Sequence, residues 1–224
     1  MRHLASGLAT LWTAGGVVFL FHGEAGSPVW WDVVWVLLLA MAAYLEVVEV
    51  GGLGRARMFA GIALVVFGGM VLLTALTGWP FGPIRFTGPE ALRLGNVFPL
   101  LPPLALFAGL ALSQRALSGA FPELGTNALA ALVAGVFTLT AANGLIFLCK
   151  VRLWWLWNPW DNGAAWGAGL FGLASLAAAA FFLSRIHPED TALKLSRWSP
   201  AAAPLVALNL LFLAANAATF LVEK

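Results

Sequence analysis

Charged residues, cysteine and histidine are all scarce in this chain of 224 residues. Aspartate, glutamate, lysine and arginine together make up 10% of it, whereas soluble globular domains carry roughly 25%. The single cysteine, Cys149, excludes an intramolecular disulfide and a cysteine-based metal cluster. The three histidines, His3, His22 and His187, are too scattered for a multi-histidine metal site or paired haem ligation. A net charge of +2 gives no signature of nucleic-acid binding, and no cofactor is predicted.

Apolar residues make up 61% of the chain, and its mean hydropathy is +0.90. This composition predicts an integral membrane protein, and no polar stretch is long enough for a second domain. Because a spanning helix needs ~20 apolar residues, we expect an all-α, polytopic membrane helix bundle of about seven transmembrane helices in one domain, residues 1–224. The expected spans are residues 4–21, 29–50, 58–76, 96–116, 126–149, 164–183 and 201–222. The first resembles a signal-peptide core but is slightly long, so we expect it to remain as a span.

Seven spans divide the loops between two faces. The N-terminal face carries seven basic residues, Arg2, Arg55, Arg57, Arg115, Arg185, Lys194 and Arg197, and the other face carries five, Arg85, Arg93, Lys150, Arg152 and Lys224. This bias predicts a cytoplasmic N-terminus.

Two unusual segments fall on the face opposite the N-terminus. Residues 77–103 are rich in glycine and proline, and residues 150–161 hold four tryptophans, at positions 154, 155, 157 and 160. Irregular backbone cannot face hydrocarbon, because unpaired N–H and C=O groups are too unfavourable there. We therefore expect residues 77–103 to form a structured loop over a membrane pocket, with the tryptophan-rich segment and Asp32 on the same face.

Three acids lie within the second expected span. A charge near the bilayer centre costs at least ~2.5–3.5 kcal/mol, so such acids usually face the protein interior and have a function. Glu46 and Glu49 are three residues apart and share a helix face; they either pair with Arg55 or Arg57 at the interface or act inside the membrane. Asp32 is either an interfacial residue in an aromatic belt or a functional acid.

Several other residues also allow two interpretations. Arg85 either anchors a carboxylate in a pocket or lies at the lipid headgroups. The tryptophans of residues 150–161 either form an interfacial belt or line a site. Asn143, inside the fifth expected span, either bonds to another helix or contacts a ligand.

Two blocks of sequence carry a family resemblance. The first is Thr77-Gly-Trp-Pro-Phe-Gly-Pro followed by Arg85-Phe86-Thr87, Leu94-Gly95, Phe98-Pro99-Leu100 and Pro102; the second is Trp155-Leu156-Trp157 followed by residues 161–163 and Trp166-Gly167. In order, separation and hydropathy, these blocks resemble the membrane family of carotenoid biosynthesis proteins, which includes bacterioruberin-type proteins and carotenoid 1,2-hydratases.

The resemblance implies a multi-pass protein of a bacterial or archaeal-type cell membrane that hydrates the terminal C1,2 double bond of an acyclic carotenoid or similar polyene lipid. Such a reaction needs an acid to protonate the alkene and aromatic faces to stabilise the carbocation that water captures. The acids available for catalysis are Asp32 first, then Asp161, with Glu46 in the other half of the membrane. The expected substrate-binding residues are Phe81, Arg85, Phe86, Asn143, Trp155, Trp157 and Trp166.

The chain departs from the family at its acids. The family commonly has a glutamate in the helix before the first block and an aspartate in the helix before the second, but residues 58–76 and 126–149 contain no acid. The alternative is therefore a non-enzymatic membrane subunit that binds a carotenoid, or that packs with partner membrane subunits in a larger pigment or electron-transfer complex. A transporter would instead need Glu46 and Glu49 to face a water-filled cavity.

Overall fold

Three helices dominate the structure. The computed structural model describes residues 2–21, 29–79, 84–86, 93–94, 98–120 and 155–157, with five further positions between 203 and 210. The elements are α1 (Arg2–Phe21), α2 (Val29–Thr77), β1 (Ile84–Phe86), β2 (Arg93–Leu94), β3 (Phe98–Pro99), α3 (Leu101–Ala120) and β4 (Trp155–Trp157). The predicted helical class is confirmed for this part of the chain, in which the strands are only two or three residues long.

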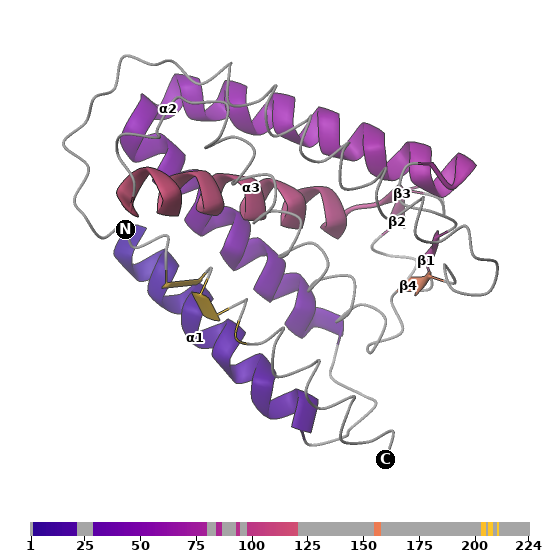
Figure 1. Ribbon diagram of the computed structural model, residues 1–224, viewed down its shortest axis with the longest axis horizontal. Helices are drawn as coiled ribbons and strands as arrows, with labels where there is room; N and C mark the ends of the chain where they lie inside the picture. The colour runs from indigo at the N-terminus through magenta and orange to yellow at the C-terminus, as the bar shows by residue number, and fades with distance from the viewer. Residues whose placement is uncertain are drawn as a thin grey trace.

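Helix α2 consists of two arms that meet at a sharp bend (Figure 1). The bend is at Gly52, whose φ of 75° and ψ of 168° are not helical and suit a residue without a Cβ atom. We call residues 29–51 the first arm and residues 53–77 the second arm. The expected loop over residues 51–57 was too long, because the helix resumes directly after this single glycine.

Helix α3 begins five residues later than expected. Residues 96–116 were predicted as a span, whereas α3 runs from Leu101 to Ala120. Pro102 and Pro103 consequently lie in the first turn, where the missing N–H groups have no intrahelical acceptor in any case. Pro99 lies in β3 and not in the helix, so the proline pair starts α3 and does not kink it.

One helical segment in the described part of the chain is long and apolar enough to cross a membrane. It is Gly51–Thr77, with 27 residues and a mean hydropathy of 2.4 over its most apolar window. Only 33% of that window is buried within the protein, whereas the core helix of a soluble protein is mostly buried. This segment indicates association with a membrane. The expected spans at residues 126–149 and 164–183 lie outside the described residues, as does most of 201–222.

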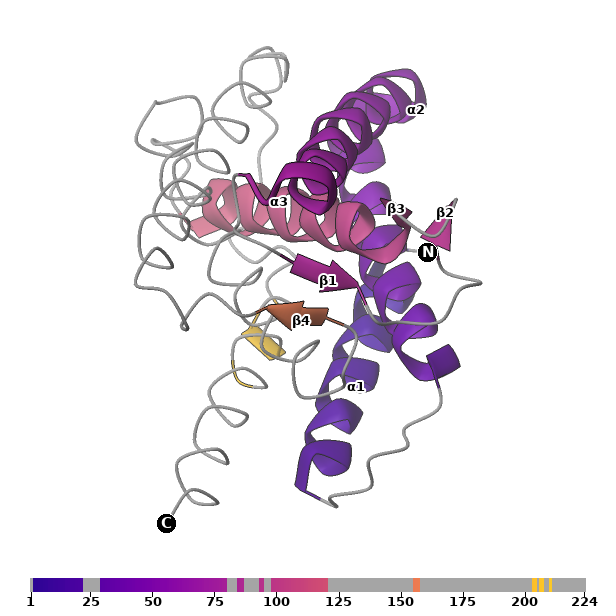
Figure 2. The same ribbon diagram turned by 90° about the vertical axis from the view of Figure 1, so that its right-hand side faces the viewer.

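The core lies where α3 packs against both arms of α2, while α1 packs along the first arm (Figures 1 and 2). Phe59 of the second arm and Phe107 of α3 place their ring centroids 6.2 Å apart at a tilt of 54°. Phe67 and Leu110 are fully buried in the same cluster. These contacts hold α3 against the two arms of α2.

A buried hydrogen bond joins α1 to α2. The indole Nε1–H of Trp35 donates to Thr13 Oγ1 at 2.9 Å, and the Thr13 hydroxyl donates to the carbonyl of Ala9 at 2.7 Å. Both side chains are buried. The Thr13 hydroxyl thus accepts a hydrogen bond from α2 and donates one within α1. This arrangement fixes the orientation of α1 about its own axis relative to the first arm.

Replacing Thr13 with valine is expected to lower the free energy of unfolding by about 1–3 kcal/mol, because the buried indole N–H loses its acceptor. Thr10→Val is the matched control, since the half-buried Thr10 hydroxyl donates to the carbonyl of Ser6 in its own helix and bonds to no other helix in the described part of the chain. Denaturant titration of the two variants measures the difference. Equal losses of stability at the two positions would contradict the role assigned to Thr13.

Candidate functional site

Strands β1 and β4 bring the two family-resembling blocks together. They pair antiparallel, with Ile84 opposite Trp157, Arg85 opposite Leu156 and Phe86 opposite Trp155. Figure 2 shows them side by side, although they come from segments far apart in the chain. The glycine- and proline-rich loop and the tryptophan-rich segment are therefore neighbours in the structure, and their common membrane face stays a prediction.

The register of this two-stranded ribbon assigns the residues expected to bind substrate to two different faces. Residues directly opposite each other belong to the same face, and successive residues alternate between faces. Phe86, Trp155 and Trp157 therefore belong to one face, together with Ile84, while Arg85 belongs to the other.

The end of α2 directs the chain into this ribbon. Gly78, with φ of 76°, donates its N–H to the carbonyl of Thr74 at 2.8 Å, which is a left-handed C-terminal cap. The buried Thr74 hydroxyl lies 2.7 Å from the carbonyl of Met70 and 3.2 Å from that of Trp79. The helix therefore ends at a fixed position immediately before the loop.

A second ribbon continues the loop towards α3. Strands β2 and β3 pair antiparallel, with Arg93 opposite Pro99 and Leu94 opposite Phe98. Leu94 and Phe98-Pro99 of the first block are thus paired directly in front of α3. In the glycine- and proline-rich stretch between α2 and α3, residues 84–86, 93–94 and 98–99 all form short paired strands.

Of the acids proposed for catalysis, Asp32 lies in the first turn of α2. In Figure 1 the start of the first arm and the end of the second arm lie on the side that carries β1 and β4. The expected residues Phe81, Asn143, Asp161 and Trp166 lie outside the described residues.

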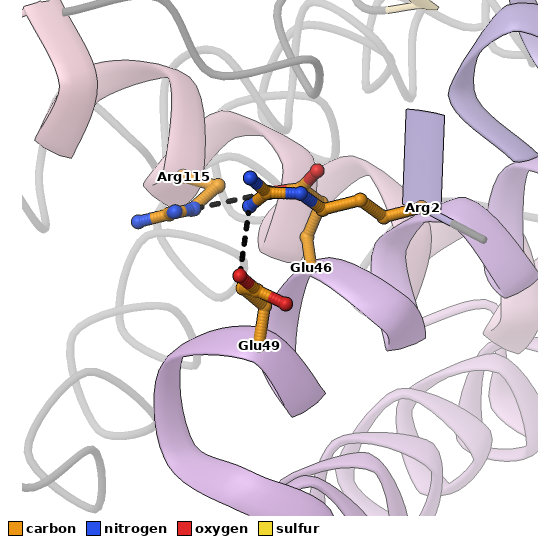
Figure 3. Close-up of polar contacts among 4 residues, drawn as sticks. All are labelled: Arg2, Glu46, Glu49 and Arg115. Carbon is orange, nitrogen blue, oxygen red and sulfur yellow. Dashed lines mark hydrogen bonds and ion pairs between the residues drawn. The ribbon is translucent and has the colours of Figure 1, made fainter. Parts of the chain in front are cut away.

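Glu46 is fully buried and forms an ion pair with α3. Its Oε2 accepts a hydrogen bond from Arg115 Nε at 3.1 Å, and the Arg115 side chain is 13% exposed (Figure 3). One turn further along the first arm, Glu49 Oε1 lies 3.5 Å from Arg2 Nη1 of α1, with both side chains more accessible to solvent. Charged residues from three helices therefore meet at one end of the bundle.

The prediction that Glu46 and Glu49 pair with Arg55 or Arg57 was wrong. The chain bends at Gly52, so both arginines begin the second arm and are exposed there. The start of α1 and the end of α3 reach Glu49 and Glu46 instead. Sorting the loops into two faces places Arg2 and Arg115 on the N-terminal face together with Arg55 and Arg57, so that grouping contained the true partners but did not single them out.

Glu49→Gln is expected to change the free energy of unfolding by no more than about 1 kcal/mol, because an exposed ion pair contributes ~0–1 kcal/mol. The Glu49 side chain is 54% exposed and its partner 27%, so water replaces the lost interaction. Detergent-based unfolding measures the change. A loss of several kcal/mol would show that this pair is as important as the buried one.

Among the residues that the structure describes, no three side chains of His, Cys, Asp or Glu lie close enough to hold a metal ion. The candidate site is the aromatic face of the β1–β4 ribbon, and Asp32, in the first turn of α2, is the acid first considered for it. In comparisons with known proteins, no family model, no curated protein and no solved structure matches this chain.

Proposed function

We propose that this chain is a multi-pass membrane protein of carotenoid biosynthesis that adds water to the terminal C1,2 double bond of an acyclic carotenoid. The observation that carries the proposal is the pairing of β1 with β4, which joins the two sequence blocks of the resemblance in one ribbon. A ribbon holding Phe86, Trp155 and Trp157 on one face offers aromatic area for a polyene.

The distribution of residue sizes supports embedding in a bilayer. Large apolar side chains on α1 and on both arms of α2 are exposed: Leu4, Leu8, Leu11, Leu37, Met41, Met58, Val65 and Leu76. Many residues at the helix contacts are small or polar: Ala5, Ala9, Thr13, Ala42, Ala43, Glu46, Ala56, Ala63 and Thr74. Membrane helices pack through small residues and present large apolar ones to lipid. We propose about seven spans in a bacterial or archaeal-type cell membrane, with a cytoplasmic N-terminus.

The reaction requires an acid, an aromatic surface and one water molecule. A proton added to C2 of the terminal alkene leaves a tertiary carbocation at C1. Water then forms a bond to C1 and returns a proton to the carboxylate, so the catalyst is regenerated. Positioned acids of this kind contribute about 10²–10⁴-fold, and indole rings stabilise a cation without offering a nucleophile.

Asp32 is our proposed proton donor and Asp161 the second choice. A carotenoid is about as long as the hydrocarbon core is thick, ~30 Å, so its end lies near the face that carries the loops. Trp155 and Trp157 line the cation, with Phe81, Phe86, Asn143 and Trp166 contacting the chain. Arg85 closes the pocket from the other face of the ribbon.

A carotenoid-binding subunit without chemistry is the second candidate. The observation that favours it is the Glu46–Arg115 ion pair, which engages one of the three candidate acids in helix packing. The absence of acids from residues 58–76 and 126–149 points the same way. Such a subunit binds the polyene, or joins partner membrane subunits, through the same aromatic ribbon.

Pigment analysis tests both candidates. The chain is expressed in cells that accumulate lycopene, and the extracted pigments are compared by mass with those of cells carrying an empty vector. We expect products heavier by one or two water molecules. Unchanged lycopene that copurifies with the protein would support the binding subunit, and unchanged lycopene without copurification would reject both the hydratase and carotenoid binding.

A further inference from the structure

The bend of α2 exposes a surface that combines two arginines with two large apolar side chains. Arg55 and Arg57 are exposed, and so are Leu53 and Met58, each at 50%. We call these four residues the basic turn. They follow Gly52 directly, at the end of the bundle where α1 starts and α3 ends (Figure 1).

The other charges described at this end are already paired with one another. Arg115 is bonded to Glu46, and Arg2 lies beside Glu49 (Figure 3). Within the described ranges, neither Arg55 nor Arg57 forms an ion pair or a side-chain hydrogen bond. The basic turn therefore carries an excess of two positive charges over the acids described around it.

These arginines do not stabilise the helix that carries them. They lie in the first turns of the second arm, where the helix dipole disfavours positive charge. Exposed Leu53 and Met58 beside them add apolar surface that water solvates poorly. A partner that suits the whole surface is therefore both anionic and apolar.

The length of the helix places this surface at the edge of a bilayer. Gly51–Thr77 has 27 residues, and at 1.5 Å per residue it is about 40 Å long, roughly 10 Å more than the hydrocarbon core. Its ends consequently reach the headgroup region on both sides. At the far end Trp79 is 51% exposed, as expected for an aromatic residue at a membrane interface.

We propose that the basic turn binds the phosphate groups of anionic phospholipids, with Arg55 and Arg57 on the phosphates and Leu53 and Met58 among the upper acyl chains. The charge excess selects anionic lipid over zwitterionic lipid, and the flanking apolar residues select lipid over a dissolved anion. This proposal rests on the membrane embedding proposed above but is independent of carotenoid chemistry.

Native mass spectrometry of the full chain in detergent tests the proposal, with equal amounts of phosphatidylglycerol and phosphatidylcholine added. The wild-type protein is expected to retain phosphatidylglycerol in preference by about 30-fold, which corresponds to two basic residues near an anionic surface. The double variant Arg55→Gln/Arg57→Gln is expected to lose this preference. Arg55→Lys/Arg57→Lys is expected to keep most of it, because the charge remains.

Lys150→Gln/Arg152→Gln removes the same charge from the loop expected on the opposite face, and we expect it to bind phosphatidylglycerol as the wild type does. Equal retention of the two lipids by wild-type protein would overturn the proposal without any variant. A preference that survives in Arg55→Gln/Arg57→Gln, or that disappears equally in the loop control, would also overturn it. Neither result affects the pigment analysis, so the lipid-binding proposal and the carotenoid proposal can be rejected independently of each other.

Discussion

Replacing Arg115 with leucine is expected to lower the free energy of unfolding by about 3–5 kcal/mol, as for other buried ion pairs that lose one partner. The reason is that Glu46 is fully buried and accepts a 3.1 Å hydrogen bond from this guanidinium. The substitution leaves a carboxyl group between the helices without the cation that offsets its desolvation. Titration with sodium dodecyl sulfate in mixed micelles measures the change.

A double variant separates the ion pair from the packing around it. Glu46→Leu/Arg115→Leu is expected to recover most of the stability lost in Arg115→Leu, since two apolar side chains leave no buried charge. Glu49→Gln is the control for loss of a single charge at the same end of the bundle. If Arg115→Leu unfolded no more easily than Glu49→Gln, the ion pair would contribute nothing beyond an exposed one.

Replacing Asp32 with asparagine is expected to reduce carotenoid hydration by about 10²–10⁴-fold, the usual contribution of a positioned general acid. Asparagine keeps the shape and polarity of the side chain but cannot supply the proton. The measurement is the ratio of hydrated to unchanged lycopene in cells with equal amounts of membrane-inserted protein. Copurification of lycopene with the variant serves as a separate measure of substrate binding.

Two further variants complete this experiment. Asp32→Glu keeps a carboxyl group and is expected to retain part of the activity, while Asp161→Asn tests the second candidate acid. Full hydration by Asp32→Asn would remove Asp32 from the mechanism. If Asp161→Asn alone lost activity, the proton donor would lie in the tryptophan-rich segment.

The sequence predicts the helices of the described chain well because each is a long apolar run. Residues 4–21, 29–50 and 58–76 all fall within observed helices. The errors are at helix boundaries, where one or two residues determine where a helix bends or begins. Gly52 alone makes the bend, and residues 53–57 continue as helix despite their two arginines. Leu101 starts α3 because a proline pair is compatible with a first turn, which hydropathy does not register.

The sequence predicts which segments form the candidate site, but not how the residues of those segments are arranged. Counting the expected spans predicts residues 77–103 and 150–161 on one face, and the structure pairs residues 84–86 with residues 155–157. Counting cannot give the register, because three-residue strands have too short an alternation to recognise. Arg85 and Trp155 therefore could not be assigned to opposite faces. The Glu46–Arg115 pair was missed for a similar reason, since the acid and the base are 69 positions apart and only packing brings them together.

The pairing of β1 with β4 also sets an order for the folding of the chain. Residues 84–86 are synthesised well before residues 155–157, whereas α1, α2 and α3 are complete by residue 120. The contacts among these helices can form while β1 still lacks its partner strand. A lone three-residue strand is not stable, so β1 is completed only when the tryptophan-rich segment arrives. Closure of the aromatic ribbon is therefore a late, long-range step that follows helix packing.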